Sequence, residues 1–113
     1  MRYAIPVSNG RLAPHFGHCE EFAIIDVDEA TRTIVGKRLI ASPEHQPGLL
    51  PPWLANEGVS AVIAGGMGSR AQMLFKENGI EVILGAVEEK PEQLIMSYIR
   101  GTLETGLMHV TIR

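Results

Sequence analysis

Residues 59–85, VSAVIAGGMGSRAQMLFKENGIEVILG, contain the pattern that decides the fold. Val59–Ala64 is a short apolar run typical of a buried strand, and a glycine-rich turn follows it. Ser69–Asn78 then has the composition of a helix, and Ile80–Leu84 is a further strand. A strand, a helix and a strand in this order predict a parallel pair joined by a right-handed crossover.

The first forty residues predict a different arrangement. Three strands are expected at Tyr3–Val7, Phe22–Val27 and Thr33–Ile40, with only a short turn between the last two. Strands joined by so short a turn pair antiparallel. The chain therefore begins as an antiparallel meander.

Two more helices complete the order of elements. Leu49–Glu57 has prolines in its first turn, where a helix tolerates them, and Pro91 to about Arg100 has apolar residues at helical spacing. Three antiparallel strands followed by helix, strand, helix, strand and helix predict a ribonuclease H-like three-layer α/β fold with a mixed five-stranded sheet. A chain of 113 residues suits one domain, residues 1–113. The pattern of residues 103–113 is ambiguous.

Composition narrows the classes of function. The net charge of −3 argues against a nucleic-acid binder, which needs a basic surface. The sequence has no apolar run long enough for a membrane span and no secretory signal, so a cytoplasmic location is expected. One cysteine leaves a free thiol, which agrees with a reducing compartment.

Residues for the common hydrolytic mechanisms are missing. The first strand carries no carboxylate to hold a pair of divalent metals, and the sequence has no Gly-x-Ser-x-Gly, His-Glu-x-x-His or Walker A motif. The sequence therefore predicts a protein that is not an enzyme.

Two segments of this acidic chain contain no acid. Residues 1–19 contain Arg2, Arg11, His15 and His18, and residues 58–76 contain Arg70 and Lys76. If the two segments meet in space, they form a local anion-binding face. The alternative is that they are strands and turns in which acids are scarce.

A cluster of possible metal ligands lies in PHFGHCEEF, residues 14–22. His15, His18 and Cys19 offer imidazole and thiol groups, which suit zinc, copper, iron and metal-sulfur clusters. Pro14 and the glycine favour a loop, so their convergence is not assured, and His45 in a later loop is a further candidate ligand. The alternative is that Cys19 is a small buried hydrophobe and that the histidines cap turns.

The turn before the second predicted helix suits an anion. Gly66, Met67, Gly68, Ser69 and Arg70 begin a G-x-G-x-x-A pattern, with exposed backbone N–H groups, a possible serine cap and a cation. With Glu88 as a ribose-binding acid, the same pattern is typical of dinucleotide sites, but it follows three antiparallel strands here. A tight turn without a ligand is the remaining alternative.

Taken together, these segments resemble the dinitrogenase iron-molybdenum cofactor biosynthesis family, the small single-domain relatives of NifX and of the NifB C-terminal domain. The matching pieces are IPV near the start, PHFGHCEEF, HQPGLLPPWL and residues 59–85, and they cover most of residues 3–85. The resemblance implies a ribonuclease H-like fold and a protein that binds and carries anionic iron-sulfur or molybdenum-sulfur clusters. The orange protein of sulfate reducers, which is similar, holds a molybdenum-copper sulfide cluster.

The resemblance also implies a site and partners. It points to His15, His18, Cys19 and His45 as metal ligands and to Gly66–Arg70 as the cradle; we add Arg11 from the acid-free segment. The expected partners are the metallocofactor and cofactor-assembly proteins, without nucleic acid or membrane, and the chain is expected to be a monomer or small homo-oligomer. Other readings remain: a nucleotide-binding module, a mononuclear zinc or iron site, and an interaction module whose motif is structural.

Overall fold

The computed structural model describes residues 1–14, 16–44, 46 and 48–100. Its strands are β1 (Arg2–Ser8), β2 (Arg11–Leu12), β3 (Glu21–Asp28), β4 (Thr33–Ala41), β5 (Ala61–Ile63) and β6 (Glu81–Ile83). Its helices are α1 (Leu50–Asn56), α2 (Ser69–Glu77) and α3 (Pro91–Arg100), and a single 3₁₀ turn, η1, covers Phe16–His18. No helix among these residues has the length and apolar character needed to cross a membrane.

The strands form one mixed sheet in the order β4-β3-β1-β5-β6, with the two-residue β2 paired to β1 alone. β3 runs antiparallel to both β1 and β4, whereas β5 runs parallel to β1 and to β6. The predicted ribonuclease H-like α/β fold is confirmed, as are its antiparallel first half and parallel second half, but the sheet has six strands and not the expected five because β2 was not predicted. The ends of most elements differ by one or two residues from those expected.

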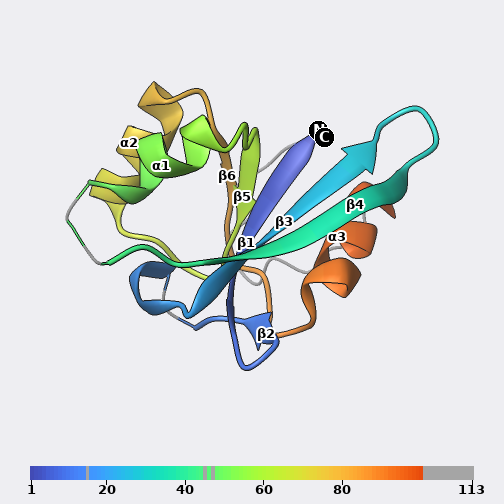
Figure 1. Cartoon of the computed structure of the whole chain (residues 1–113), viewed down its shortest axis with the longest axis horizontal. Helices are drawn as coiled ribbons and strands as arrows, with labels where there is room; N and C mark the ends of the chain where they lie inside the picture. The colour runs from blue at the N-terminus through green and yellow to red at the C-terminus, as the bar shows by residue number, and fades with distance from the viewer. Residues whose placement is uncertain (15, 45, 47, 101–113) are drawn as a thin grey trace.

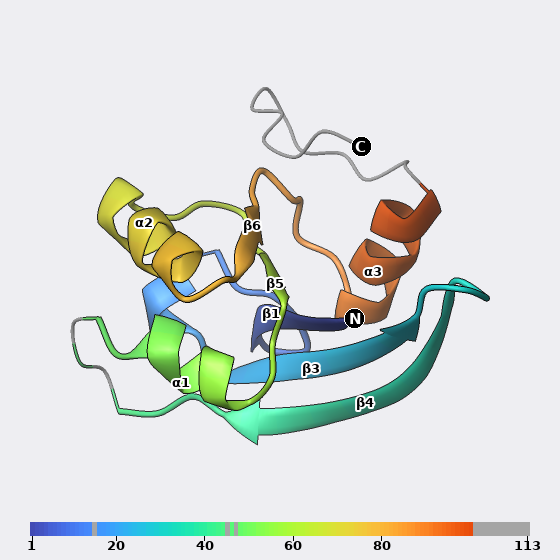
Figure 2. The same ribbon diagram turned by 90° about the horizontal axis from the view of Figure 1, so that it is seen from above.

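Two apolar cores lie on the two faces of the sheet. Helices α1 and α2 cover one face, where Phe22, Leu54 and Phe75 are fully buried. Helix α3 covers the other face with Leu94 and Ile95. Figures 1 and 2 show the three layers, with α1 and α2 on one side of the strands and α3 on the other.

The segment between β1 and β3 contains two features that the sequence analysis missed. A hairpin joins β1 to β2 through Asn9 and Gly10, which both have positive φ angles, as a two-residue type I′ turn requires. The expected loop before β3 contains the 3₁₀ turn η1. The ambiguous residues 103–113 lie outside the described residues.

The topology brings three distant segments to one edge of the sheet. Val7 at the end of β1 pairs with Glu21 at the start of β3, which in turn pairs with Ala41 at the end of β4. Because β5 runs parallel to β1, its carboxyl end lies at the same edge. The segments that precede β3, follow β4 and follow β5 therefore meet there, and these segments carry the residues singled out in the sequence.

Arg2 lies at the opposite end of β1 and fastens the sheet to the helix layer. Its Nε donates to Asp26 Oδ1 at 2.6 Å, and its Nη1 donates to the carbonyl oxygen of Glu57 at 2.6 Å. The hydrogen bond from Arg2 lowers the pKa of the Asp26 carboxyl. Arg2 therefore makes structural contacts at the opposite end of β1 from the sheet edge where the two acid-free segments meet.

The lowered pKa of Asp26 predicts a pH dependence of stability. The pair contributes stability above the pKa of an unfolded Asp, about 3.9, and this contribution is lost as pH falls through the lower folded value. We expect wild-type protein to lose urea resistance below about pH 4 more steeply than Asp26→Asn. Arg2→Met is the matched variant and should flatten the profile equally. Equal slopes in all three proteins would contradict the prediction.

Candidate functional site

Two adjoining pockets lie at the edge of the sheet where the three segments meet. The first, which we call the glycine pocket, has a volume of about 380 Å³. It is lined by Pro14, Phe16, Gly17, Gly66, Met67, Gly68 and Ala71. The segment before β3 thus faces the turn after β5 across one pocket, so the two acid-free segments, whose meeting the sequence left open, do meet in space.

The second pocket, the arginine pocket, has a volume of about 300 Å³ and takes in the segment after β4. Its lining residues are Phe16, Gly17, Gln46, Gly48, Leu50, Pro51, Arg70, Ala71 and Leu74. Phe16, Gly17 and Ala71 line both pockets, so the two pockets adjoin and we treat them as one candidate site. Both volumes reach the lower end of the range for small-ligand sites, roughly 300–1,000 Å³.

The charge of this site is positive. Arg70 is the only charged side chain among the described residues that line either pocket. The nearby carboxylate of Glu20 instead accepts a hydrogen bond from the backbone N–H of Asn9 in the β1–β2 turn. An anion entering the site therefore meets one cation and no described carboxylate.

The start of α2 adds backbone donors. Gly68 occupies the N-cap position and has no side chain to satisfy the first N–H groups, while Ser69 is the first helical residue. The expectation that Ser69 caps the helix is therefore wrong. Gln72 steadies the turn by donating from Nε2 to the carbonyl oxygen of Met67 at 2.9 Å. The uncapped amino end of a helix favours negative charge.

The glycines of the glycine pocket are not required by the fold. None of Gly17, Gly66 and Gly68 has a positive φ angle, and a Cβ added to any of them would meet nothing within 4 Å. Neither backbone conformation nor a crowding neighbour explains them. Side chains here would instead fill the pocket, so the glycines keep open a space next to exposed backbone.

Cys19 lies apart from both pockets. Its side chain is 9% exposed and belongs to the core that contains Phe16 and Phe22. The Sγ atom lies 3.9 Å from the Oγ of Ser42, to which the thiol donates. Burial raises the pKa of this thiol, because the thiolate would lose its hydration. The alternative of a small buried hydrophobe therefore describes the observed environment of Cys19.

The remaining predicted ligands divide into two groups. His15 and His45 lie outside the described residues, and of His18 only the backbone, in η1, is described. Among the described residues, no three His, Cys, Asp or Glu side chains are grouped as a metal site would need. Arg11 is exposed on β2 and lines neither pocket. The roles of the histidines and of Arg11 stay predictions.

Sequence reasoning missed the apolar wall of the site. Phe16, Leu50, Pro51 and Leu74 come from three separate segments, and each reads in the sequence as an ordinary core residue. The signal for two of them was HQPGLLPPWL, residues 45–54, because Leu50 and Pro51 from this segment line the arginine pocket.

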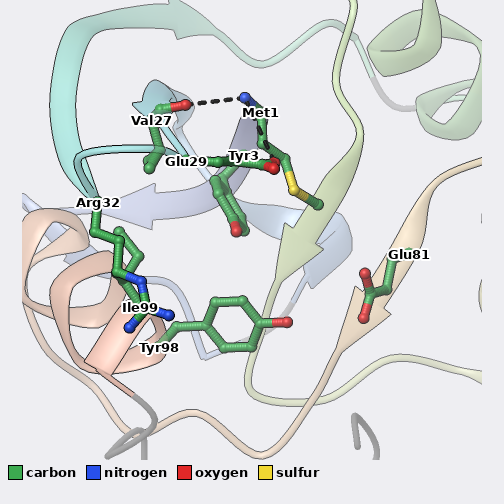
Figure 3. Close-up of a pocket in the computed structure, with 8 residues that line it drawn as sticks. All are labelled: Met1, Tyr3, Val27, Glu29, Arg32, Glu81, Tyr98 and Ile99. Carbon is green, nitrogen blue, oxygen red and sulfur yellow. Dashed lines mark hydrogen bonds and ion pairs between the residues drawn. The ribbon is translucent and has the colours of Figure 1, made fainter. Parts of the chain in front are cut away.

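A third pocket lies on the opposite face of the sheet, beside α3, and Figure 3 shows its lining. It includes the carboxylates of Glu29 and Glu81 together with Arg32 and Tyr98. None of the predicted site residues lines it, and its two carboxylates do not suit an anion. The candidate site is therefore the pair of pockets beside α2.

Fold and site together define a small α/β domain with an anion-suited, glycine-lined pocket at one edge of a mixed sheet. Comparison with known sequences gives the family: a profile described as "Dinitrogenase iron-molybdenum cofactor" matches residues 1–101. The chain belongs to this family, and the resemblance inferred from its motifs is confirmed.

Three individual proteins are similar to this chain in sequence or in fold. The uncharacterized protein MJ0580 of Methanocaldococcus jannaschii is 35% identical over 109 residues, which cover 92% of this chain and 90% of that protein. The crystal structure of PH0822 superposes with a TM-score of 0.86 at 26% identity, over 95% of this chain and 96% of that one. The apo form of the orange protein from Desulfovibrio gigas shares the fold, with a TM-score of 0.70 at 21% identity over 97% and 96% of the two chains.

Proposed function

We propose that this protein is a non-catalytic binding or carrier protein for an anionic iron-sulfur or molybdenum-sulfur cluster, or its precursor, in metallocofactor assembly or trafficking. The observation that carries the proposal is the pair of adjoining pockets at the sheet edge, one lined by glycines and the other containing Arg70. Membership of the dinitrogenase iron-molybdenum cofactor family supports it. Cofactor-assembly proteins are the partners that such a cargo implies.

The chemistry of the lining fits a cargo of this class. Sulfide-rich clusters are bulky, soft and negatively charged, and hydrogen bonds to their sulfur atoms change their reduction potentials. Arg70 and the uncapped N–H groups of α2 stabilise the negative charge of the cluster. Met67 and the apolar wall suit its weakly hydrated sulfide surface. In the proposal, the imidazoles of His15, His18 and His45 supply metal ligands.

Anaerobic reconstitution tests the function. Purified protein is incubated with tetrathiomolybdate, or with ferrous iron and sulfide, and is desalted before metal analysis and visible absorption spectroscopy. We expect retained molybdenum or iron with sulfide-to-metal absorption bands, and loss of both when His15 and His18 are changed together to alanine. Protein that retains no metal from any of these reagents would refute the proposal.

The same preparation separates the alternatives. Adenine nucleotides should leave the melting temperature unchanged, because Glu88 lines neither pocket of the site. A nucleotide that raises it would favour the nucleotide-binding module. Retention of zinc or iron at one ion per chain without sulfide would favour the mononuclear site.

The open space around the glycines of the glycine pocket predicts a variant that binds less tetrathiomolybdate without losing stability. Gly66→Ala adds a methyl group that meets no protein atom within 4 Å, at a position without positive φ. The unfolding free energy should stay equal or rise by up to about 1 kcal/mol, since alanine restricts the unfolded chain. Tetrathiomolybdate retention should fall, because the methyl group occupies space in the glycine pocket.

Gly79→Ala is the contrasting variant. It also has open space around an added Cβ, but its φ of +75° strains any other residue. It should therefore lose stability and keep its affinity for tetrathiomolybdate. If Gly66→Ala binds the anion as well as wild type does, the glycine pocket is not the binding site.

A further inference from the structure

We propose that Cys19 is a positioning residue, which fastens together the two segments that carry the predicted histidine ligands, and that it is not a ligand of the cargo. This inference rests on the proposed function, since it concerns how the same site is held. It has a consequence for how the cargo is held, because Cys19 is the only cysteine in the chain.

The location of Cys19 argues against ligation. A thiolate ligand must bring its sulfur to about 2.3 Å from a metal such as zinc. Cys19 is 9% exposed, packs in the core on the α1 and α2 side of the sheet, and lines neither the glycine pocket nor the arginine pocket. Its neighbour Phe16 lines both pockets and belongs to the same core.

The contacts of Cys19 assign it the positioning role. Its thiol donates to the Oγ of Ser42, the first residue after β4, at 3.9 Å. The backbone N–H of Ser42 in turn donates to the carbonyl oxygen of Glu20 at 3.1 Å. One side-chain contact and one backbone hydrogen bond thus join the segment before β3 to the segment after β4. Holding both segments in place before binding reduces the ordering cost of binding.

The consequence concerns how the cargo is held. Iron-sulfur clusters are generally held on proteins by cysteine thiolates, and with Cys19 in the core this site offers none. A cluster that is transferred to this site therefore exchanges a terminal ligand for a protein donor other than a thiolate. The metal-sulfide bonds stay intact and no electron is gained or lost.

The test uses tetrathiomolybdate as the probe and compares wild type, Cys19→Ala, Ser42→Ala and the double variant. Each single variant should bind with wild-type stoichiometry and an affinity lower by about two- to fivefold, and the double variant should be no weaker than the weaker single variant. This non-additivity identifies one shared contact. Melting temperatures show that each variant is folded, and Ser42→Ala keeps the test valid if Cys19→Ala does not fold.

Other outcomes overturn the inference. If Cys19→Ala abolishes retention while Ser42→Ala does not, the thiol is a ligand. If both variants lose stability but bind with wild-type affinity, Cys19 serves packing alone.

A separate measurement on unloaded protein distinguishes failure of this inference from failure of the proposed function. Iodoacetamide should modify Cys19 in the folded protein at least about tenfold more slowly than in urea, because the side chain is buried. Rapid modification of the folded protein would overturn the placement of Cys19 even if no probe binds at all.

Discussion

Changing Arg70 to glutamate is expected to lower the affinity for tetrathiomolybdate by at least tenfold. Arg70 is the only charged side chain among the described residues lining the two pockets. A unit charge about 4 Å from a doubly charged anion contributes roughly 2 kcal/mol at the dielectric constant of water and roughly 8 kcal/mol at an effective value of about 20. Reversing the charge replaces this attraction with repulsion of similar size, and about 1.4 kcal/mol is enough for a tenfold change.

Lys76→Glu is the matched control for this charge reversal. Lys76 lies on the same helix and is exposed, but it lines neither pocket of the site. Its variant carries the same net charge as Arg70→Glu, so a long-range effect of net charge should weaken both equally. Titrations of both at low and high salt measure this, because screening reduces the contribution of a distant charge first. Equal losses of affinity would show that Arg70 has no local role.

The fold could be predicted from the sequence because its strands and helices have distinct patterns. The apolar run before the glycine-rich turn is too short for a typical helix, β3 is a continuous apolar run, and β4 alternates along part of its length. The short strand β2 could not be found by pattern, since two residues have no periodicity. Its signal was the pair Asn9-Gly10, which favours a tight hairpin.

The site was predicted less completely, because a sequence shows which residues are near in the chain and not which way they point. The sequence left open whether the two acid-free segments meet, and the structure shows that they do, because one pocket is lined by Pro14, Phe16, Gly17, Gly66, Met67 and Gly68. Phe16 in η1 and Cys19 just after it both lie in the core beside α1 and α2, but of the two only Phe16 also lines the pockets. That difference depends on local backbone angles, which residue spacing alone did not indicate.

Phe75→Ala is expected to cause the largest loss of stability, about 3–5 kcal/mol, because the side chain is fully buried and its removal leaves a cavity. Its ring meets Phe16 edge-to-face with centroids 5.4 Å apart, and Phe16 meets Phe22 in the same manner at 5.8 Å. A loss of this size is a large part of the 5–15 kcal/mol typical of a domain. Urea unfolding at neutral pH measures it.

Because Phe16 lines both pockets, the same substitution should also weaken retention of tetrathiomolybdate. Phe75→Leu keeps most of the volume and should lose less than about 1.5 kcal/mol, with a correspondingly smaller effect on binding. Met73→Ala, on the same helix but 62% exposed, should change stability by no more than about 0.5 kcal/mol. If Phe75→Ala loses this stability but retains tetrathiomolybdate as well as wild type does, the aromatic core does not support the pocket wall.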